Sequence, residues 1–168
     1  MWVKDYMCRW VNTIEPQKSI ADAAKKMVEK KTNSLIVVDK EGKPIGLITS
    51  HILIQETVPE YLKDNEISAQ FGAEGVFDKY AAKVKNQKLE DVMYSDFHTL
   101  SIDDAMIEAA AYASKEQRRT IPVVDKEGKL TGAITRTCIK NALYNAIFKD
   151  KKIDPTIDRN GEFKKQDR

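Results

Sequence analysis

The sequence predicts an α/β protein of the α+β type in which one structural unit is used twice. The first observation is that the tetrapeptide at 39–42, Asp-Lys-Glu-Gly, recurs at 125–128, an offset of 86 residues. The second is that the same offset aligns residues 3–53 with 89–139 without a gap. The third is that each copy shows the same order of helical and strand-like patterns. A chain of 168 residues has room for two such half-size units that share a core.

The first half of each copy predicts a short extended segment followed by a helix. The extended segment ends at Thr13 in the first copy and at Thr99 in the second. Beyond it, small and apolar residues recur at helical spacing, with charged residues between them. These residues are Ile20, Ala23, Ala24, Met27 and Val28 in the first copy, and Met106, Ala109, Ala110 and Ala113 in the second.

The second half of each copy predicts two strands joined by a tight turn, and then another helix. The first strand is the β-branched run 35–38 or 121–124, short enough to be buried. The repeated Asp-Lys-Glu-Gly turn ends on a glycine, which suits a left-handed conformation. The return strand covers 44–48 or 130–134, and Thr49 or Thr135 then stands where a helix N-cap is expected. The apolar stripe of the last helix is formed by Ile139, Leu143 and Ile147, with Ala142 and Ala146.

The domain organisation follows from the repeat. We assign residues 1–55 to the first repeat, 56–87 to a helical insertion, 88–148 to the second repeat and 149–168 to a charged tail that we expect to be mobile. Within the insertion, an amphipathic helix and a shorter one are predicted, with Gly72 and Gly75 between them. The longer helix contains Val76, Phe77, Tyr80, Ala81 and Val84, and the shorter one Val58, Tyr61 and Leu62.

Composition excludes several classes of protein. Lys and Arg number 28 against 26 Asp and Glu, a formal net charge of +2, which argues against a dedicated nucleic-acid-binding protein. Cys8 and Cys138 are far apart and fit a reducing compartment. The N-terminus lacks the pattern of a secretory signal, and no apolar run approaches the roughly 20 residues of a membrane helix. We therefore expect a soluble cytoplasmic protein without a membrane or nucleic-acid partner.

The opening segments of the two copies are similar to each other: 3–7 (Val-Lys-Asp-Tyr-Met) and 89–93 (Leu-Glu-Asp-Val-Met). Both resemble the start of a repeat of the CBS family, named for cystathionine β-synthase. The runs 121–125 and 132–135 resemble its central strand and the beginning of its ligand motif, and 35–39 and 46–49 match them in the first copy. The resemblance implies two pseudo-symmetric repeats packed sheet to sheet. It also implies a regulatory module that binds AMP, ADP, ATP or a related adenosyl compound in clefts between the repeats, with no required cofactor.

The chain departs from the family pattern at one position of each ligand motif. The motif ends in an Asp that accepts hydrogen bonds from ribose hydroxyls, and the matching residues are Ile52 and Cys138. A charged hydrogen bond is worth about 1.5–3 kcal/mol, so its loss weakens ribose recognition by roughly one to two powers of ten. The fold implied by the resemblance does not depend on this residue, whereas the ligand does.

The candidate ligand-binding residues lie at the ends of the predicted strands. Thr49 and Thr135 mark strand-to-helix junctions, where backbone N–H groups and the helix dipole suit a phosphate, although each also serves as an N-cap. Arg118, Arg119 and Arg136 are candidate phosphate ligands, or residues of a solvated turn, and the first copy has no cation at the matching positions. The resemblance adds Thr13, Thr99, Ser34 and Thr120, whose alternative role is to satisfy turns, and it adds Ile121 and Cys138.

No catalytic or metal site is predicted, because His51, His98 and the two cysteines form no close cluster and no phosphate-binding glycine loop accompanies them. The leading hypothesis is therefore a homodimeric sensor of an adenine nucleotide that regulates a protein partner. The alternative is a protein-interaction or scaffold module that has lost nucleotide binding. The missing carboxylates and the insertion, with Phe77 and Tyr80, favour this alternative.

Overall fold

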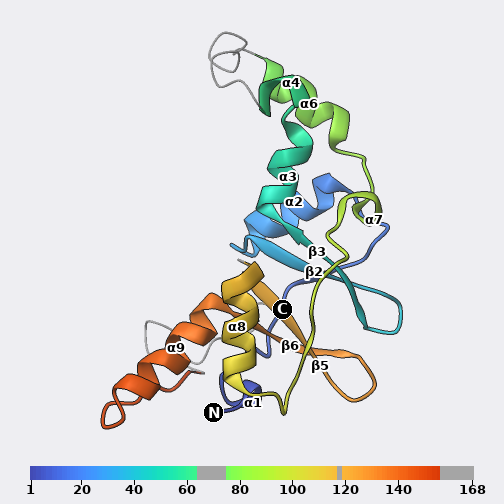
Figure 1. Ribbon diagram of the computed structural model, residues 1–168. Coiled ribbons are helices and arrows are strands. Elements are labelled where there is room, and N and C mark those ends of the chain that lie inside the picture. Colours follow the sequence, from blue (N-terminus) through green and yellow to red (C-terminus); the bar gives the residue numbers. More distant parts are fainter. Residues whose placement is uncertain (64–74, 117–118, 156–168) are drawn as a thin grey trace. The chain divides into compact units, whose positions relative to one another are not determined.

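The structure, a computed structural model, describes residues 1–63, 75–116 and 119–155. These residues form a mixed α/β fold with two three-stranded sheets, in the orders β1-β2-β3 and β4-β5-β6, which confirms the predicted class (Figure 1). The elements of the first half are α1 Val3–Tyr6, β1 Thr13–Ile14, α2 Ile20–Glu29, β2 Ser34–Val38, β3 Pro44–Thr49, α3 Ser50–Thr57, α4 Glu60–Lys63 and α6 Val76–Val84. Those of the second half are α7 Leu89–Val92, β4 Leu100–Ser101, α8 Met106–Glu116, β5 Thr120–Val124, β6 Leu130–Thr135 and α9 Arg136–Ile147.

The predicted repeat is confirmed at the level of individual elements. α1 and α7, β2 and β5, and β3 and β6 begin and end at residues that differ by the same offset found in the sequence. In each sheet the short first strand pairs parallel to the central strand, as β1 does with β2 and β4 with β5. β5 and β6 form an antiparallel hairpin in which Thr120 is the partner of Thr135.

The two repeated turns have the predicted left-handed glycine. Gly42 has φ +80° and Gly128 has φ +81°, a conformation in which glycine carries no Cβ penalty. Each turn is closed by its aspartate. Oδ1 of Asp39 and Oδ1 of Asp125 each accept two backbone N–H bonds of 2.9 Å from inside the turn. The sequence Asp-Lys-Glu-Gly-Lys therefore forms the same hairpin loop twice.

The segments before β1 and β4 contain more structure than the sequence pattern predicts. α1 and α7 are single helical turns within stretches expected to be extended. At α1, the Asp5 carboxylate accepts a bond of 3.0 Å from the Trp2 backbone N–H, which satisfies a donor at the start of the turn. One turn is too short to produce a recognisable helical period.

The described chain divides into two compact units that do not coincide with the two repeats of the sequence. Unit 1 contains Met1–Val11, Val38–Pro44 and the described residues from Asp96 onward; unit 2 contains Asn12–Val37 and Ile45–Ser95. In unit 1, Cys8 and Ala133 exchange two backbone hydrogen bonds of 2.9 Å. In unit 2, Tyr94 and Leu47 do the same. Each opening segment therefore pairs with the return strand of the other repeat.

Each unit has its own hydrophobic core. The core of unit 1 consists of Val3, Met7, Leu100, Met106, Ala109, Ile121, Val123, Ile134, Cys138 and Ala142. The core of unit 2 consists of Ile14, Ile20, Ala23, Met27, Leu35, Val37, Ile48 and Leu89. Val3 and Leu89, which begin the two short opening helices, are both fully buried, so the exchanged segments contribute to the cores.

The apolar stripe predicted for the last helix is only partly directed into the core. The buried residues of α9 are Cys138, Ala142 and Asn145, whereas Leu143 is 57% exposed and Ile147 61% exposed. The buried face of α9 is rotated by about one residue from its apolar stripe. It includes the polar side chain of Asn145. Leu143 and Ile147 are therefore left on the surface of unit 1, whereas Ile139 packs partly against its core.

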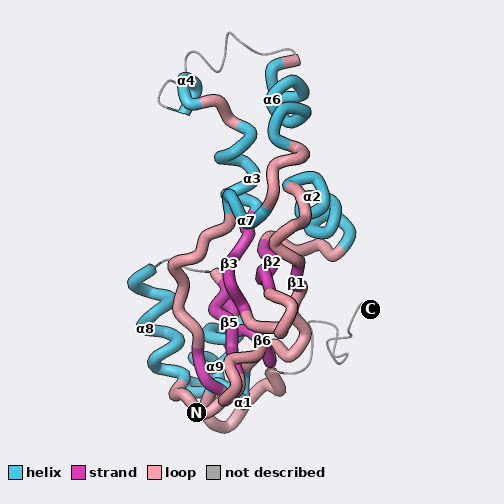
Figure 2. The backbone as a smooth tube through the Cα atoms, turned by 90° about the vertical axis from the view of Figure 1, so that its right-hand side faces the viewer, coloured by secondary structure: helices cyan, strands magenta, loops and turns pink. Residues whose placement is uncertain are grey.

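The insertion is helical where the structure describes it. α6 lies alongside α3, and Val84 at its end packs against the core of unit 2 (Figures 1 and 2). Gly75 precedes α6 with φ +82°, whereas Gly72 lies outside the described residues. The tail was expected to be mobile from Lys149, but Ile153 is hydrogen-bonded to the buried Asn145 side chain. Residues 156–168 lie outside the described part.

Candidate functional site

The two strand-to-helix junctions have the predicted capping geometry. The Thr49 hydroxyl oxygen accepts a bond of 3.3 Å from the Ile52 backbone N–H at the start of α3. The Thr135 hydroxyl oxygen accepts one of 3.4 Å from the Cys138 backbone N–H at the start of α9. Each threonine therefore satisfies one N–H group of its helix, and the other N–H groups of the first turn point in the same direction.

The antiparallel register of β5 and β6 brings two candidate arginines to the same place. Thr120 begins β5, Thr135 ends β6, and the two are direct partners. Arg119 precedes the one and Arg136 follows the other, so both leave the hairpin at its α9 end. Both are exposed, and Arg119 forms no ion pair with any described residue. Guanidinium groups at a helix N-terminus can bind a phosphate in bidentate fashion.

The first repeat has the same backbone arrangement without the cations. Asn33 and Ser50 occupy the positions that match Arg119 and Arg136, and the Ser50 N–H donates a bond of 3.0 Å to the Asn33 carbonyl oxygen. Thr32, which matches Arg118, uses its hydroxyl to donate to the Ser34 carbonyl oxygen at 3.1 Å. The two junctions therefore differ in charge rather than in main-chain geometry.

Two of the candidate residues have side chains in the core. Ile121 is 1% exposed and Cys138 2% exposed, and both belong to the core of unit 1. Sγ of Cys138 lies 3.2 Å from the Thr135 hydroxyl oxygen. A ligand at this junction reaches these two residues through their main chain, because their side chains face inward. Ile52, at the matching position of α3, is half-buried.

The structure distributes the remaining candidates over both units. Thr13, Ser34 and Thr49 lie in unit 2, on β1, β2 and β3. Thr99 directly precedes β4 in unit 1 and is half-buried, as is Thr120. Arg118 lies outside the described residues. The candidates whose side chains gather outside the core at one junction of unit 1 are Arg119, Thr120, Thr135 and Arg136.

The two histidines belong to different units. The His98 backbone N–H donates a bond of 2.9 Å to the Tyr112 hydroxyl oxygen, and the two rings lie 4.9 Å apart. His51 is exposed on α3. Within 1–63, 75–116 and 119–155, no three His, Cys, Asp or Glu residues lie close enough together to hold a metal ion. Across the same ranges, no helix is both long enough and apolar enough to span a membrane.

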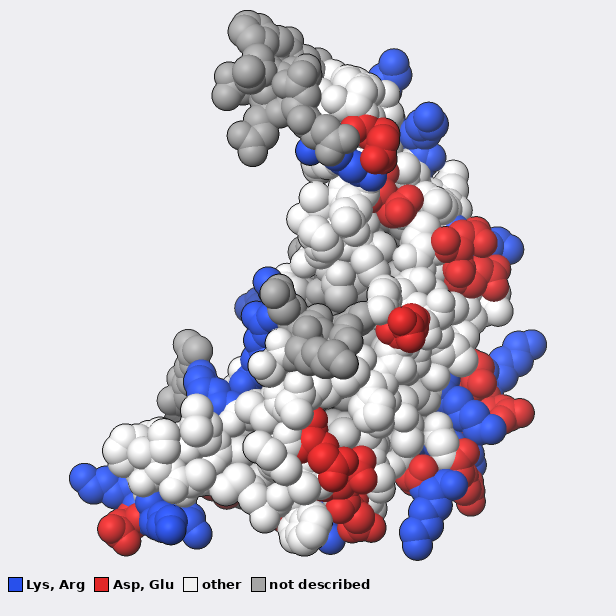
Figure 3. All heavy atoms as spheres, viewed as in Figure 1, with Lys and Arg blue, Asp and Glu red and all other residues white. Residues whose placement is uncertain are grey.

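Surface charge is mixed in sign. On the face shown in Figure 3, Lys and Arg side chains and Asp and Glu side chains gather in separate small groups, and neither sign covers the face. The two hairpin turns carry internal ion pairs, in which Lys43 contacts Glu41 at 2.9 Å and Lys129 contacts Glu127 at 3.0 Å. In the Lys43 pair, the hydrogen bond to Glu41 raises the pKa of the ammonium group.

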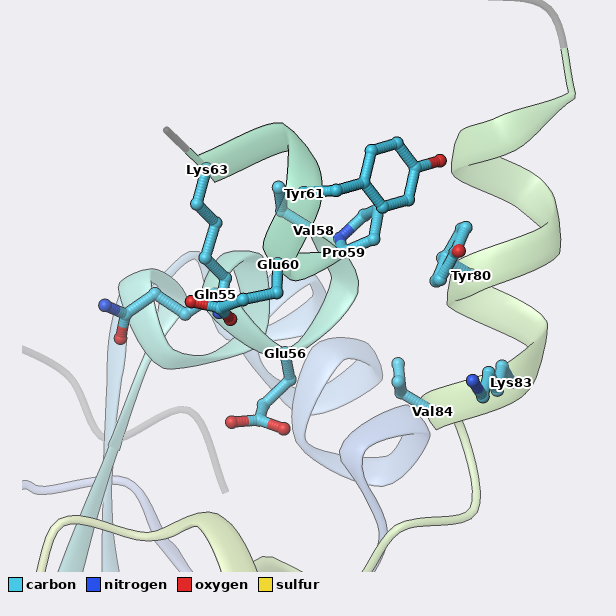
Figure 4. A pocket seen from close by; sticks show the side chains of 10 residues that line it. All are labelled: Gln55, Glu56, Val58, Pro59, Glu60, Tyr61, Lys63, Tyr80, Lys83 and Val84. Carbon is cyan, nitrogen blue, oxygen red and sulfur yellow. The ribbon is translucent and has the colours of Figure 1, made fainter. Parts of the chain in front are cut away.

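Sequence reasoning missed two polar features of the structure. The first is Asn145, whose spacing from Ala142 and Ala146 gave no sign of burial. The second is a cleft in the insertion lined by Tyr61 and Tyr80 (Figure 4). Both tyrosines lie in predicted helices of the insertion, but the cleft forms only because α6 packs against α3. No local pattern reports such a contact.

Comparison with known proteins gives a family match over most of the chain. The model of the CBS domain matches residues 3–58 and 89–145. The solved CBS-pair protein CBSX2 of Arabidopsis thaliana has a TM-score of 0.72 and 24% identity, over 89% of this chain and 98% of that one. A structure of CBSX2 in complex with AMP has a TM-score of 0.65 and 25% identity, over 87% and 98% of the two chains.

Two other relatives match this chain over nearly their whole length. A CBS domain pair solved with 5′-methylthioadenosine and S-adenosyl-L-methionine has a TM-score of 0.64 and 23% identity, over 87% of this chain and 98% of that one. A CBS domain-containing protein of Dictyostelium discoideum is 25% identical over 86% of this chain and 92% of its own length.

Longer relatives match this chain over only a small part of their length. The chain spans 32% of a glycine betaine/carnitine/choline transport ATP-binding protein of Bacillus subtilis and 22% of a homoserine O-acetyltransferase of Methanococcoides burtonii. Relatives with enzyme names thus contain the matched region as a minor part. The region matched in this chain is the CBS repeat pair.

Proposed function

The chain belongs to the CBS domain family, and from this premise we propose that it senses an adenine nucleotide or a related adenosyl compound. The observation that carries the proposal is the second junction, where Arg119 and Arg136 flank the Thr120–Thr135 pair at the start of α9. Two guanidinium groups beside a helix N-terminus suit a phosphate. The AMP complex of CBSX2 supports an adenylate as the ligand.

We propose that the phosphate contributes more to recognition than the ribose. The residues at the usual ribose-binding carboxylate are Ile52 and Cys138, and the Cys138 side chain is buried in the core. Neither side chain supplies a charged acceptor. AMP is therefore expected to bind far more tightly than adenosine, and 2′-deoxy-AMP almost as tightly as AMP. Rising salt is expected to weaken binding, because the arginines are exposed.

A thermal-shift screen tests the proposal. The panel is AMP, ADP, ATP, S-adenosylmethionine, NAD and cyclic dinucleotides. At about 100 times its Kd a ligand adds about 2.7 kcal/mol to the free energy of unfolding, which raises Tm by several degrees. We expect this rise with at least one adenine nucleotide, and its loss in Arg119→Ala but not in the control Lys126→Ala, which changes an exposed turn residue. No shift with any member of the panel contradicts the proposal.

The second candidate is a protein-interaction module without a nucleotide. The observation that favours it is Phe77 on α6, which is 71% exposed. An exposed aromatic residue on an insertion is typical of a docking site when it belongs to a larger apolar patch. This candidate predicts that the whole panel leaves Tm unchanged, so the same screen separates the two functions.

We further propose that the module is a homodimer in the cytoplasm. Large apolar side chains remain exposed on the helices of both repeats: Val28 on α2, Ile54 on α3, Ile107 on α8, and Leu143 and Ile147 on α9. In unit 2, α2 and α3 border a groove of about 500 Å³ whose apolar lining includes Met27 and Leu53. A second copy would cover such surfaces, which soluble monomers rarely leave exposed.

A further inference from the structure

The insertion contains a cleft that lies wholly within unit 2. It has a volume of about 540 Å³ and opens between the α3–α4 segment and α6 (Figure 4). This volume is within the range of roughly 300–1,000 Å³ that is usual for small-molecule sites. The second repeat has no counterpart, because the insertion occurs once. None of the cleft residues belongs to the set proposed for the nucleotide.

One wall of the cleft is aromatic and apolar. Tyr61 from α4 points toward Tyr80 on α6, with Val58 and Pro59 beside it (Figure 4). Interaction with the Tyr80 hydroxyl raises the pKa of Tyr61 above its ordinary value. The Tyr61 hydroxyl therefore stays protonated at neutral pH, and the wall carries no charge there. Two tyrosine rings on one wall offer apolar surface to a ligand.

Two residues of opposite charge line the same cleft from different helices. Glu56 lies on α3 and Lys83 on α6, and neither forms an ion pair with another described residue. Glu60, by contrast, already receives a bond of 2.8 Å from Lys63. Nζ of Lys83 lies 5.8 Å from the centre of the Tyr80 ring, on the aromatic side of the cleft. The cleft thus combines an available carboxylate, an available ammonium group and an apolar wall.

We infer that this cleft binds an apolar α-amino acid or another zwitterion of the same build. The ligand ammonium group would pair with Glu56, its carboxylate with Lys83, and its side chain would lie against Tyr61 and Pro59. A zwitterion satisfies both protein charges at once. A simple cation or anion would pair with only one of them and leave the other partly desolvated without a partner.

Calorimetric titration with L-leucine, L-methionine and L-phenylalanine tests the inference. At least one of them is expected to bind. For L-leucine, 4-methylpentanoate lacks the amine and 3-methylbutylamine lacks the carboxylate, and each is expected to bind about tenfold or more weakly because one charged hydrogen-bonding group is lost. Comparable binding of an amino acid and both of its analogues would overturn the inference, because the charges would then play no part.

Variants of the chain give the second arm of the test. Glu56→Gln and Lys83→Gln keep the size of each side chain and are each expected to weaken amino-acid binding about tenfold or more. Lys79→Gln is the matched control, since Lys79 is exposed on the same helix and does not line the cleft. The Tm of each ligand-free variant shows whether the fold is retained.

The outcome is distinguishable from that of the nucleotide proposal. AMP binding is expected to be unchanged in Glu56→Gln, and L-leucine binding unchanged in Arg119→Ala, because the two sets share no residue. Absence of binding by all three amino acids at about 10 mM, a concentration that would reveal even a millimolar Kd, overturns the inference. Equal binding by wild type, Glu56→Gln and Lys83→Gln also overturns it.

Discussion

Gly46 and Gly132 occupy the same position in the two repeats, but each faces a different kind of neighbour. A Cβ at Gly132 would lie 2.6 Å from the carbonyl oxygen of Cys8. A Cβ at Gly46 would meet the Met93 side chain, including its Cγ at 2.8 Å. The Cys8 carbonyl oxygen is hydrogen-bonded to the Ala133 N–H and can move only if the backbone moves. The Met93 side chain can change rotamer readily. The absence of a side chain is therefore required more strictly at Gly132.

Gly132→Ala is expected to lower the free energy of unfolding by about 1–3 kcal/mol, the usual cost of overpacking a well-packed site. Gly46→Ala is expected to cost less, because Met93 can move aside. Urea denaturation of both variants measures the difference. An equal or larger cost for Gly46→Ala would show that the Cys8–Ala133 pairing is not the constraint that excludes a side chain.

The role of a single residue could be predicted from the sequence where its partners lie a few positions away along the chain. The caps at Thr49 and Thr135 bond to residues three positions away, and the turn glycines act within four residues. The proximity of Arg119 and Arg136 depends instead on the strand register, and the burial of Cys138 on the packing of α9. These features need the fold, because the residues involved come together only when the sheet forms.

At the scale of elements, the end of α9 is held by one buried polar side chain. Nδ2 of Asn145 donates to the Tyr6 hydroxyl at 3.1 Å and to the Ile153 carbonyl oxygen at 3.0 Å. Its Oδ1 accepts from the Ile153 N–H at 2.8 Å. Asn145 is 5% exposed, so these bonds satisfy a group that would otherwise be costly to bury. They attach α1 and the segment after α9 to the same point of the helix.

Asn145→Leu is expected to lower the free energy of unfolding by about 1–3 kcal/mol, because it leaves the Ile153 backbone groups and the Tyr6 hydroxyl without this partner. Amide exchange around Ile153 should become faster in the same variant. Denaturation and hydrogen exchange measure the two effects. Asn141→Leu, at a half-buried position of the same helix, is the control. If it costs as much as Asn145→Leu, the bonds to Ile153 are not the cause.

Helical periodicity predicted the positions of the helices. It did not predict in every helix which face is buried. In α2 the predicted stripe contains the buried residues Ile20, Ala23 and Met27, although Val28 is 78% exposed. In α9 the apolar stripe and the buried face are offset, since Asn145 is stabilised inside by its hydrogen bonds. A buried polar residue with several partners is indistinguishable, in a single sequence, from a surface residue. The hydrogen bonds between Asn145 and Ile153 in the tail could not be predicted for the same reason.

At the scale of the whole molecule, the repeat was predictable and the exchange of opening segments was not. Sequence similarity shows which residues of the two repeats are equivalent. It does not show which repeat each opening segment packs against. Met7 and Cys8 are equivalent to Met93 and Tyr94, yet each pair lies against the return strand of the other repeat. The family resemblance implied two repeats, and the comparisons confirm them over residues 3–58 and 89–145.

The proposed homodimer is expected to have a mass of about 38 kDa, twice the 19.1 kDa of one chain. Leu143→Asp should shift the protein to the monomer, because it places a charge on the exposed apolar face of α9. Phe77→Asp changes a more exposed apolar residue on α6, outside the proposed interface, and should remain dimeric. Light scattering at micromolar concentration measures all three proteins. A wild-type mass of about 19 kDa would rule out the dimer.

The most direct test of the central claim is calorimetric titration of the wild-type protein with AMP and with adenosine. AMP is expected to bind at least about tenfold more tightly, since each charge-assisted hydrogen bond to its phosphate contributes about 1.5–3 kcal/mol. Arg119→Ala should remove most of this difference, whereas Lys126→Ala should retain it. Equal affinity for adenosine and AMP, or no binding of either, would contradict the account of this chain as a phosphate-led nucleotide sensor.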